Sequence, residues 1–112
     1  MPPPKKRKLL PKDFETPFSA DPQEAKRLRA EALGSAFMRV PQLRIEAARD
    51  LLDLGFTQLY QIAGRSPETL FADIRQKRPA TPDARLADFR LAVYVAETPV
   101  PDKAKLHPAA WT

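Results

Sequence analysis

The most informative run of this 112-residue chain is Val40-Pro41-Gln42-Leu43-Arg44-Ile45-Glu46-Ala47-Ala48-Arg49-Asp50-Leu51, which continues to Leu54-Gly55. From Leu43 onward, apolar or small residues recur three or four positions apart, which is the spacing of one face of an α-helix. This spacing predicts a helix over residues 43–54, with an apolar stripe formed by Leu43, Ala47, Ala48, Leu51 and Leu54. The opposite, solvent-facing side is expected to carry Glu46, Arg49, Asp50 and Asp53. Proline breaks the chain before this helix, and Gly55 supplies a left-handed stop after it.

Helix start signals recur on both sides of this run. Each consists of a capping side chain followed by a proline, which loses no helical hydrogen bond at the first position. The three signals are Asp21-Pro22, Ser66-Pro67 and Thr81-Pro82. They predict helices over residues 22–36, 66–76 and 81–97, and a short helical turn over residues 57–63 ends at Gly64.

No segment alternates with period two, so the fold is predicted to be all-α, a compact bundle of four helices plus a short helical turn. Helical spacing assigns these side chains to the core: Leu28, Ala32, Leu33, Leu43, Ala47, Ala48, Leu51, Leu70, Phe71, Phe89 and Val93. Of the 13 prolines, six lie in the first 22 residues and three in the last 14. We therefore expect a disordered basic arm over residues 1–21, a folded domain over 22–98 and an extended tail over 99–112. In that tail Trp111 is expected to fold back as a lid, with an exposed contact or stacking on a base as the alternatives.

The net charge of +5 comes from the first 12 residues. That segment holds five cations and no acid, whereas residues 13–112 contain as many acidic as basic residues. The five cations are Lys5, Lys6, Arg7, Lys8 and Lys12. Three interpretations of this basic arm stay open: a weak phosphate-binding arm, a solvated tail without a specific role, or, in a eukaryote, a nuclear import signal.

Composition leaves few residues for catalysis. The chain has no cysteine and a single histidine, His107, which excludes disulfides, thiolate metal sites and multi-histidine metal sites built from this chain alone. It lacks a glycine-rich phosphate loop, a nucleophile elbow and an apolar run of the roughly 20 residues that span a bilayer. The sequence predicts a small cytoplasmic protein that is not an enzyme and uses no cofactor, metal, small-molecule substrate or membrane. A metal-dependent nuclease built from carboxylates alone stays open, but no carboxylate spacing indicates one.

Residues 40–51 resemble a helix-hairpin-helix motif. In that motif an apolar residue and a proline enter a Gly-x-Gly turn, and the next helix carries a small residue where it packs. The turn directs backbone amides and the positive end of the helix toward a phosphate. The matching positions are Val40, Pro41, Leu43, Ala48 and Leu51, while Gln42 and Arg44 replace the two glycines. Either Arg44 makes the phosphate contact with its own charge, or the hairpin is only a packing element.

Three further runs extend the resemblance over residues 28–112. They are Leu54-Gly55-Phe56-Thr57-Gln58-Leu59-Tyr60-Gln61-Ile62, Arg65-Ser66-Pro67-Glu68-Thr69-Leu70-Phe71 and Asp88-Phe89-Arg90-Leu91-Ala92-Val93-Tyr94-Val95-Ala96-Glu97. Together with the hairpin they resemble small bacterial proteins of the "pathogenicity locus" or mitomycin-resistance-related family. That family often has a cysteine early in its last helix, where this chain has Arg85. The resemblance implies a helix-hairpin-helix domain for which DNA binding is the expected role.

The residues expected to meet phosphates are Val40, Pro41, Gln42, Leu43 and Arg44 in the hairpin, Arg39 and Arg49 beside it, and the basic arm. Residues 23–49 hold six basic and three acidic residues, which is the one basic bias inside the predicted domain. The first hypothesis is a non-enzymatic protein that binds duplex nucleic-acid backbone without sequence preference. The second is a protein–protein adaptor whose hairpin is scaffold, with Arg49 in an ordinary helix-surface pair to Glu46 or Asp53. The neutral body and missing glycines favour the adaptor, whereas the arm and the local arginines favour nucleic acid.

Overall fold

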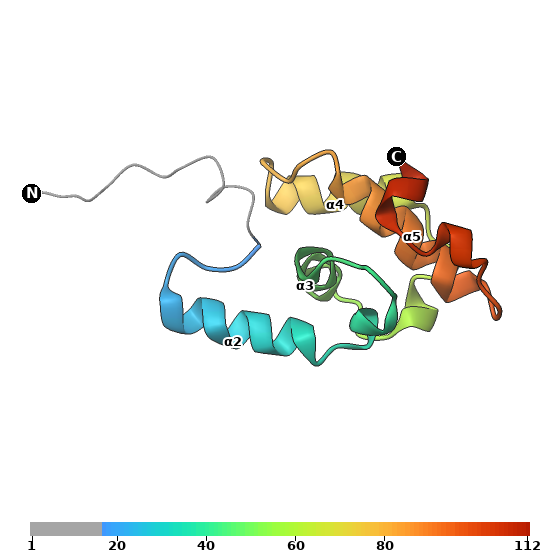
Figure 1. Cartoon of the computed structure of the whole chain (residues 1–112). Helices are drawn as coiled ribbons and strands as arrows, with labels where there is room; N and C mark the ends of the chain where they lie inside the picture. The colour runs from blue at the N-terminus through green and yellow to red at the C-terminus, as the bar shows by residue number, and fades with distance from the viewer. Residues whose placement is uncertain (1–16) are drawn as a thin grey trace, which may run out of the picture.

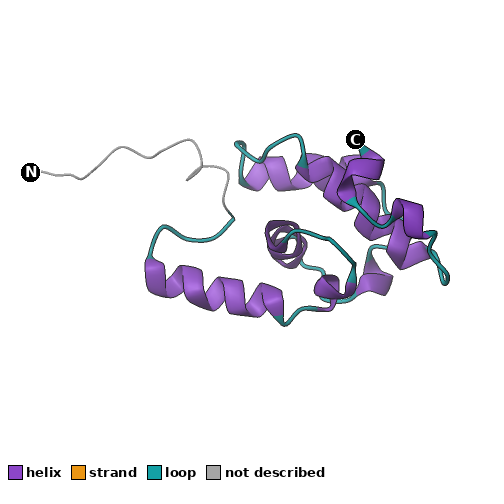
Figure 2. Ribbon diagram, viewed as in Figure 1, coloured by secondary structure: helices purple, strands orange, loops and turns teal. Residues whose placement is uncertain are grey.

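A computed structural model describes residues 17–112, and all the regular secondary structure in this part of the chain is helical, with no strand. Its α-helices are α2 (Pro22–Leu33), α3 (Ile45–Asp53), α4 (Pro67–Lys77) and α5 (Arg85–Glu97). Short 3-10 helices connect or follow them: η1 (Ala36–Arg39), η2 (Leu59–Gln61), η3 (Lys103–Lys105) and η4 (Pro108–Trp111). The predicted fold class, an all-α bundle of four helices with a short helical turn, is confirmed (Figures 1 and 2).

The helix α3 lies in the middle of the bundle. In Figure 1 it is seen nearly end-on, with α2 on one side and α4 and α5 on the other. The helix α2 packs on α3, α3 contacts α5, and α4 packs along α5. The C-terminal η4 also packs on α5, whereas α2, near the other end of the described chain, packs on α3.

Local sequence signals account for most helix ends. The carboxylate of Asp21 accepts from the amide of Gln23 at 3.3 Å, and the hydroxyl of Ser66 accepts from the amide of Thr69 at 3.2 Å, so both predicted caps are confirmed. Gly55 and Gly64 adopt φ values of 98° and 80°, the left-handed conformation that ends the preceding helical segments.

Other boundaries differ from the prediction. The first helix ends at Leu33 because the Ser35 hydroxyl bonds back to the carbonyl of Ala32 at 2.7 Å. The chain then turns into η1, which places Phe37 in the core. The last helix begins at Arg85, four residues later than predicted, because the Thr81 hydroxyl bonds to the carbonyl of Arg78 instead of capping a helix.

The core gathers between α3, α4 and α5. Its largest fully buried side chains include Phe37, Leu51, Ile62, Ile74, Phe89 and Leu91. Every predicted core residue of α3 except Leu54 is buried, and Leu54 and Phe71 are half-buried. Leu33 was assigned to the core wrongly, since it is 59% exposed where α2 ends.

Residues 99–112 are not an extended tail as predicted. They form η3 and η4, which fold back along α5. The indole Nε1 of Trp111 donates to the carbonyl of Lys105 at 2.9 Å, and its ring lies 5.1 Å from that of Tyr94. Arg90 donates to the carbonyl of Trp111 at 2.7 Å. The predicted lid role of Trp111 is confirmed, because these contacts return the segment to the domain despite its prolines.

Candidate nucleic-acid interface

The hairpin, residues 40–44, makes a tight turn between η1 and α3. The amide of Leu43 donates to the carbonyl of Val40 at 3.3 Å, which closes a four-residue turn with Pro41 and Gln42 in its middle. Gln42 has a φ of 65°, so it adopts the left-handed conformation that usually requires glycine. The backbone path of a glycine turn is therefore kept with a glutamine in the left-handed position.

The hairpin residues differ in exposure. Val40 and Leu43 are buried and anchor the turn to the core, whereas Pro41 and Gln42 are exposed. Arg44 has an extended backbone and is the N-cap of α3, which starts at Ile45 and not at the predicted Leu43. The Arg44 side chain makes no capping hydrogen bond, so the start of α3 lacks a side-chain cap of its own.

A carboxylate from α5 faces this helix start. Asp88 is fully buried, and its Oδ2 lies 3.5 Å from Nε of Arg44 and 3.9 Å from Nε of Arg85. Neither carboxylate oxygen makes a hydrogen bond to a described residue. A negative charge near a helix N-terminus is favourable, so the start of α3 and the charge of Arg44 partly offset the cost of burying Asp88.

The electrostatics of Asp88 reflect two opposing influences. Burial raises the pKa of Asp88 above its ordinary value, because a desolvated carboxylate is costly to charge. The charges of Arg44 and Arg85 and the backbone amide of Arg44 oppose this rise, and the charge of Glu46 adds to it. The amide acts on the carboxylate without reaching hydrogen-bond geometry.

The structure corrects the prediction that Arg49 faces phosphates. Arg49 is only 5% exposed, and its guanidinium bonds to Glu31 and Asp53 at 2.7 Å each and to the carbonyl of Leu28 at 3.3 Å. These bonds join α2 to α3, so Arg49 holds two helices together. Four of its five N–H groups are engaged in this way and the side chain is buried, so Arg49 is not placed to meet an external anion.

Sequence reasoning also missed a buried ion network. Asp50 is fully buried and bonds to Arg78 at 2.6 Å and to Arg85, which is 4% exposed. Arg78 in addition bonds to Asp53 at 2.8 Å. One signal was present: Asp50 lies seven residues after Leu43 and three after Ala47, on the apolar side of α3 and not on its solvent side. A charge on that stripe indicates a buried pair.

The remaining predicted cations are distributed unevenly. Arg39 and Lys26 are exposed and make no ion pair with residues 17–112. On α2, Arg27 pairs loosely with Glu24 at 3.5 Å, and the guanidinium of Arg29 lies 5.0 Å from the ring centre of Phe18. The basic arm, with Lys5, Lys6, Arg7, Lys8 and Lys12, lies outside the described residues, although Pro17 and Phe18, which follow it, are buried.

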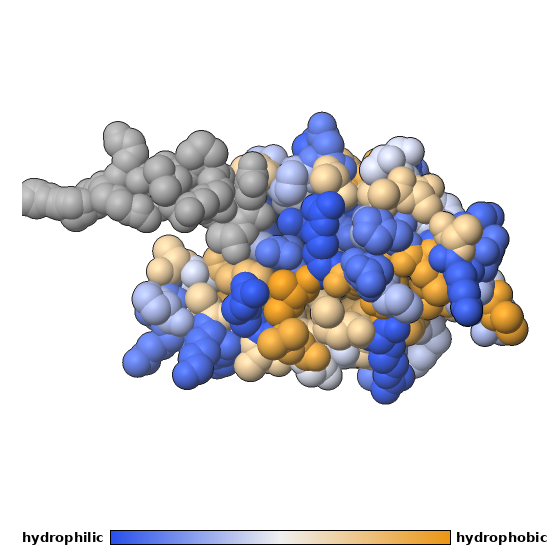
Figure 3. Space-filling model, in the orientation of Figure 1, coloured by the Kyte–Doolittle hydropathy of each residue, from blue (hydrophilic) through white to orange (hydrophobic). Residues whose placement is uncertain are grey.

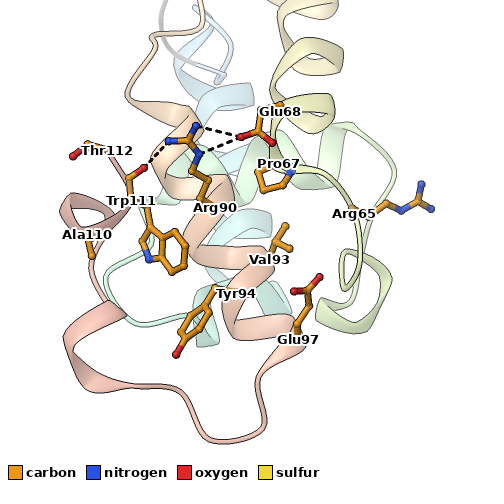
Figure 4. A pocket seen from close by; sticks show the side chains of 10 residues that line it. All are labelled: Arg65, Pro67, Glu68, Arg90, Val93, Tyr94, Glu97, Ala110, Trp111 and Thr112. Atoms are coloured by element: carbon orange, nitrogen blue, oxygen red, sulfur yellow. Dashed lines mark hydrogen bonds and ion pairs between the residues drawn. The ribbon is translucent and has the colours of Figure 1, made fainter.

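A groove lies beside α5, between η4 and the start of α4. This Trp111 groove has a volume of about 540 Å³, and its lining includes Tyr94, Trp111, Pro67, Val93 and Glu97 (Figure 4). The ion pair of Arg90 with Glu68, at 3.2 Å, closes one end of it, and the Arg65 side chain points away from it (Figure 4). The groove mixes aromatic and charged walls and holds no arrangement of nucleophile and base.

The geometry offers few means of chemistry. Within residues 17–112 no three histidine, cysteine, aspartate or glutamate side chains come together as a metal site would require. None of the helices in this part has the length and apolarity needed to cross a bilayer. Comparison of the chain with protein-family models, with curated proteins and with solved structures finds no match.

Proposed function

We propose that this chain is a non-enzymatic protein-interaction adaptor whose hairpin is scaffold. The observation that carries the proposal is the position of Asp88, which lies fully buried at the start of α3 with Arg44 beside it. A hairpin binds a phosphate through an open, positively polarised helix end. In this chain a carboxylate of the protein itself already meets that end, and Arg49 is engaged inside.

The surface supports a protein partner. On the face seen in Figure 3, apolar residues gather in a band across the middle of the molecule, and hydrophilic residues lie above and below it. Elsewhere Tyr60 is 74% exposed on η2, and the Trp111 groove presents aromatic walls. Exposed aromatic side chains are typical anchors of protein–protein contacts.

A second candidate is weak binding to nucleic-acid backbone through the basic arm, in keeping with the proposed membership of the "pathogenicity locus" family. It is favoured by five cations without an acid in residues 1–12 and by the cations on α2. Phe18 packs under Arg29, so the chain that follows the arm joins the domain beside the basic residues of α2. In this candidate the arm, Lys26 and Arg39 contact phosphates, and the hairpin does not.

A fluorescence anisotropy titration with a random duplex tests whether the hairpin takes part in any binding of nucleic acid. The wild type is compared with a full-length variant that carries glutamine at the five basic positions of the arm, and with Arg44→Ala. If the adaptor proposal is right, the arm variant loses all measurable affinity and Arg44→Ala changes nothing. Binding by the arm gives the wild type a salt slope of about −4 to −5, from about 0.9 per phosphate. Affinity that survives in the arm variant and falls with Arg44→Ala would refute the scaffold role of the hairpin.

The adaptor itself is tested by affinity capture from a nuclease-treated extract. Tyr60→Ser removes an exposed aromatic side chain that makes no hydrogen bond to residues 17–112, so the fold should be unaffected. Arg27→Ala, on α2, is the matched surface control. A partner that the wild type and Arg27→Ala retain, and that Tyr60→Ser loses, supports the proposal. Capture of nothing except nucleic acid before nuclease treatment contradicts it.

A further inference from the structure

One wall of the Trp111 groove consists of two aromatic rings held in fixed positions. The hydroxyl of Tyr94 accepts the amide of Asp102 at 2.8 Å, and the indole Nε1 of Trp111 donates to the carbonyl of Lys105 at 2.9 Å. The ring centres lie 5.1 Å apart, with their planes inclined by 44°. The single N–H of the indole is already engaged, so this wall offers a ligand mainly apolar ring surface.

The other side of the groove is aliphatic, and its two ends differ in charge. Pro67 of α4 and Val93 of α5 lie across from the rings (Figure 4). At one end Arg90 and Glu68 neutralise each other as a pair. At the other end Glu97 is exposed, accepts one backbone amide at 2.6 Å and forms no ion pair within residues 17–112. The groove therefore combines apolar walls with one uncompensated negative charge.

These features favour a segment that is rich in proline and carries positive charge. Proline-rich segments dock in aromatic-lined grooves, because their extended backbone is preformed and loses little conformational freedom on binding. A basic side chain beside the prolines can pair with Glu97 or lie over an aromatic ring. The ring of Tyr94 already has one cation near it, since Nζ of Lys105 lies 5.7 Å from its centre. An acidic segment would instead be repelled by Glu97.

The chain itself contains such a segment, and it lies outside the described residues. Its sequence is Pro2-Pro3-Pro4-Lys5-Lys6-Arg7-Lys8, here called the Pro2–Lys8 segment. No acidic residue occurs in the first 12 positions. Its charge is therefore complementary to that of the groove.

The length of the chain allows this segment to reach the groove. Phe18, which packs under Arg29, holds the start of the described chain on α2. The helix α2 packs on α3 and α3 contacts α5, so α2 and α5 are two helix spacings apart, or about 20 Å. From Pro17 back to Lys5 the chain can extend over about 40 Å. The prolines can therefore cross the bundle and arrive at α5.

We propose that the Pro2–Lys8 segment docks in the Trp111 groove of the same molecule. Its prolines pack on the rings of Tyr94 and Trp111, and its basic residues lie at Glu97. The docked segment covers the groove, so a protein partner that uses this groove must first displace it. The contact is thus autoinhibitory. It is independent of the adaptor proposal, whose test concerns Tyr60 of η2.

Trp111 provides a direct readout, because it is the single tryptophan of the chain. Its fluorescence is quenched with acrylamide, a neutral molecule, in the full-length protein. A tethered segment has an effective concentration of about 1 mM, so a segment with a Kd of that size occupies its site about half of the time. Replacing Pro2, Pro3 and Pro4 together with serine should therefore raise the quenching constant about twofold. Pro11→Ser, a change elsewhere in the same arm, should leave it at the wild-type value.

A substitution in the groove tests the other side of the contact. Glu97→Gln removes the negative charge but keeps an oxygen that can accept the amide of Gly64, and it should also raise the quenching constant. Salt screens exposed charges, so the constant of the wild type should rise with ionic strength and that of Glu97→Gln should not. Asp73→Asn, an equal change of charge at an exposed site on α4, should behave as the wild type.

Three results would overturn the proposal. The first is an equal quenching constant in the wild type, the triple serine variant and Glu97→Gln. The second is a rise with Glu97→Gln alone, because the groove would then have changed without any release of the arm. The third is a protection of Trp111 that is lost when the wild type is diluted, since the occupant would then be the arm of a second copy.

Discussion

Replacing Gln42 with glycine should stabilise the protein. At φ 65° the Cβ of a non-glycine residue crowds its own backbone, which costs about 1–2 kcal/mol. Glycine removes that crowding, but it also gives the unfolded chain more conformational freedom. That freedom lowers the stability of the folded protein by about 0.5–1 kcal/mol. The side chain of Gln42 is exposed and makes no hydrogen bond to residues 17–112, so little else is lost. The net expectation is a gain of about 0.5–1 kcal/mol, or a rise of about 3–6 °C in Tm for a domain of this size.

Gln76→Gly is the matched control, since Gln76 is an exposed glutamine inside α4. There the same substitution should destabilise by about 0.5–1 kcal/mol, because glycine is a poor helix former. Urea unfolding is measured for the wild type and both variants and analysed with one common denaturant slope. It shows for each variant whether the free energy of unfolding rises or falls. If Gln42→Gly destabilises as much as Gln76→Gly does, residue 42 is not left-handed in solution and the turn described above is wrong.

Two further predictions concern the buried charges. Arg85→Met removes the cation that Asp50 and Asp88 share, and should lower the free energy of unfolding by about 3–5 kcal/mol because each buried carboxylate loses one of its two cationic partners. Arg27→Met breaks an exposed pair with Glu24 and should change the free energy of unfolding by less than about 0.5 kcal/mol. If urea unfolding gives equal effects for the two variants, the buried network contributes no more than a surface pair. Asp88→Asn should be more stable than the wild type at neutral pH, because burial raises the pKa of Asp88 above 3.8 and the charged form therefore opposes folding. That advantage should fade as the pH falls through the raised pKa and the wild-type carboxyl becomes neutral, whereas an advantage that grows on acidification would contradict the assignment.

Much of the fold follows from local patterns in the sequence. The caps at Asp21 and Ser66 and the stops at Gly55 and Gly64 act within a few residues, so the sequence reveals them directly. The apolar stripe of α3 likewise identifies the face with which this helix packs into the core. The C-terminal segment was predicted wrongly because its folding back depends on partners on α5: Tyr94 and Arg90 hold Trp111. Prolines lower the tendency to form helices, but they do not prevent a segment from packing on a preformed surface.

The candidate site was harder to predict, because charge alone does not tell whether an arginine faces solvent. Arg39 and Arg49 have the same charge and flank the same hairpin, yet one is exposed and the other is buried between α2 and α3. The two arginines differ in their acidic neighbours, because Glu31 of α2 and Asp53 of α3 both pair with Arg49. That convergence is a tertiary fact, and no window of sequence contains it.

The backbone geometry of the hairpin suits either a phosphate site or a structural joint. A left-handed turn, a helix start and a nearby cation are the parts from which a phosphate site is built, and this chain has all three at Gln42, Ile45 and Arg44. Their use depends on a residue more than forty positions away, since Asp88 of α5 supplies the negative charge that the site attracts. In this structure the carboxyl group of Asp88 is the buried negative charge beside the hairpin. Because an internal carboxylate has the advantage of being already in place, an external phosphate must overcome both the loss of its own hydration and the charge of Asp88. For this reason the hairpin of the wild type is expected to act as scaffold at neutral pH.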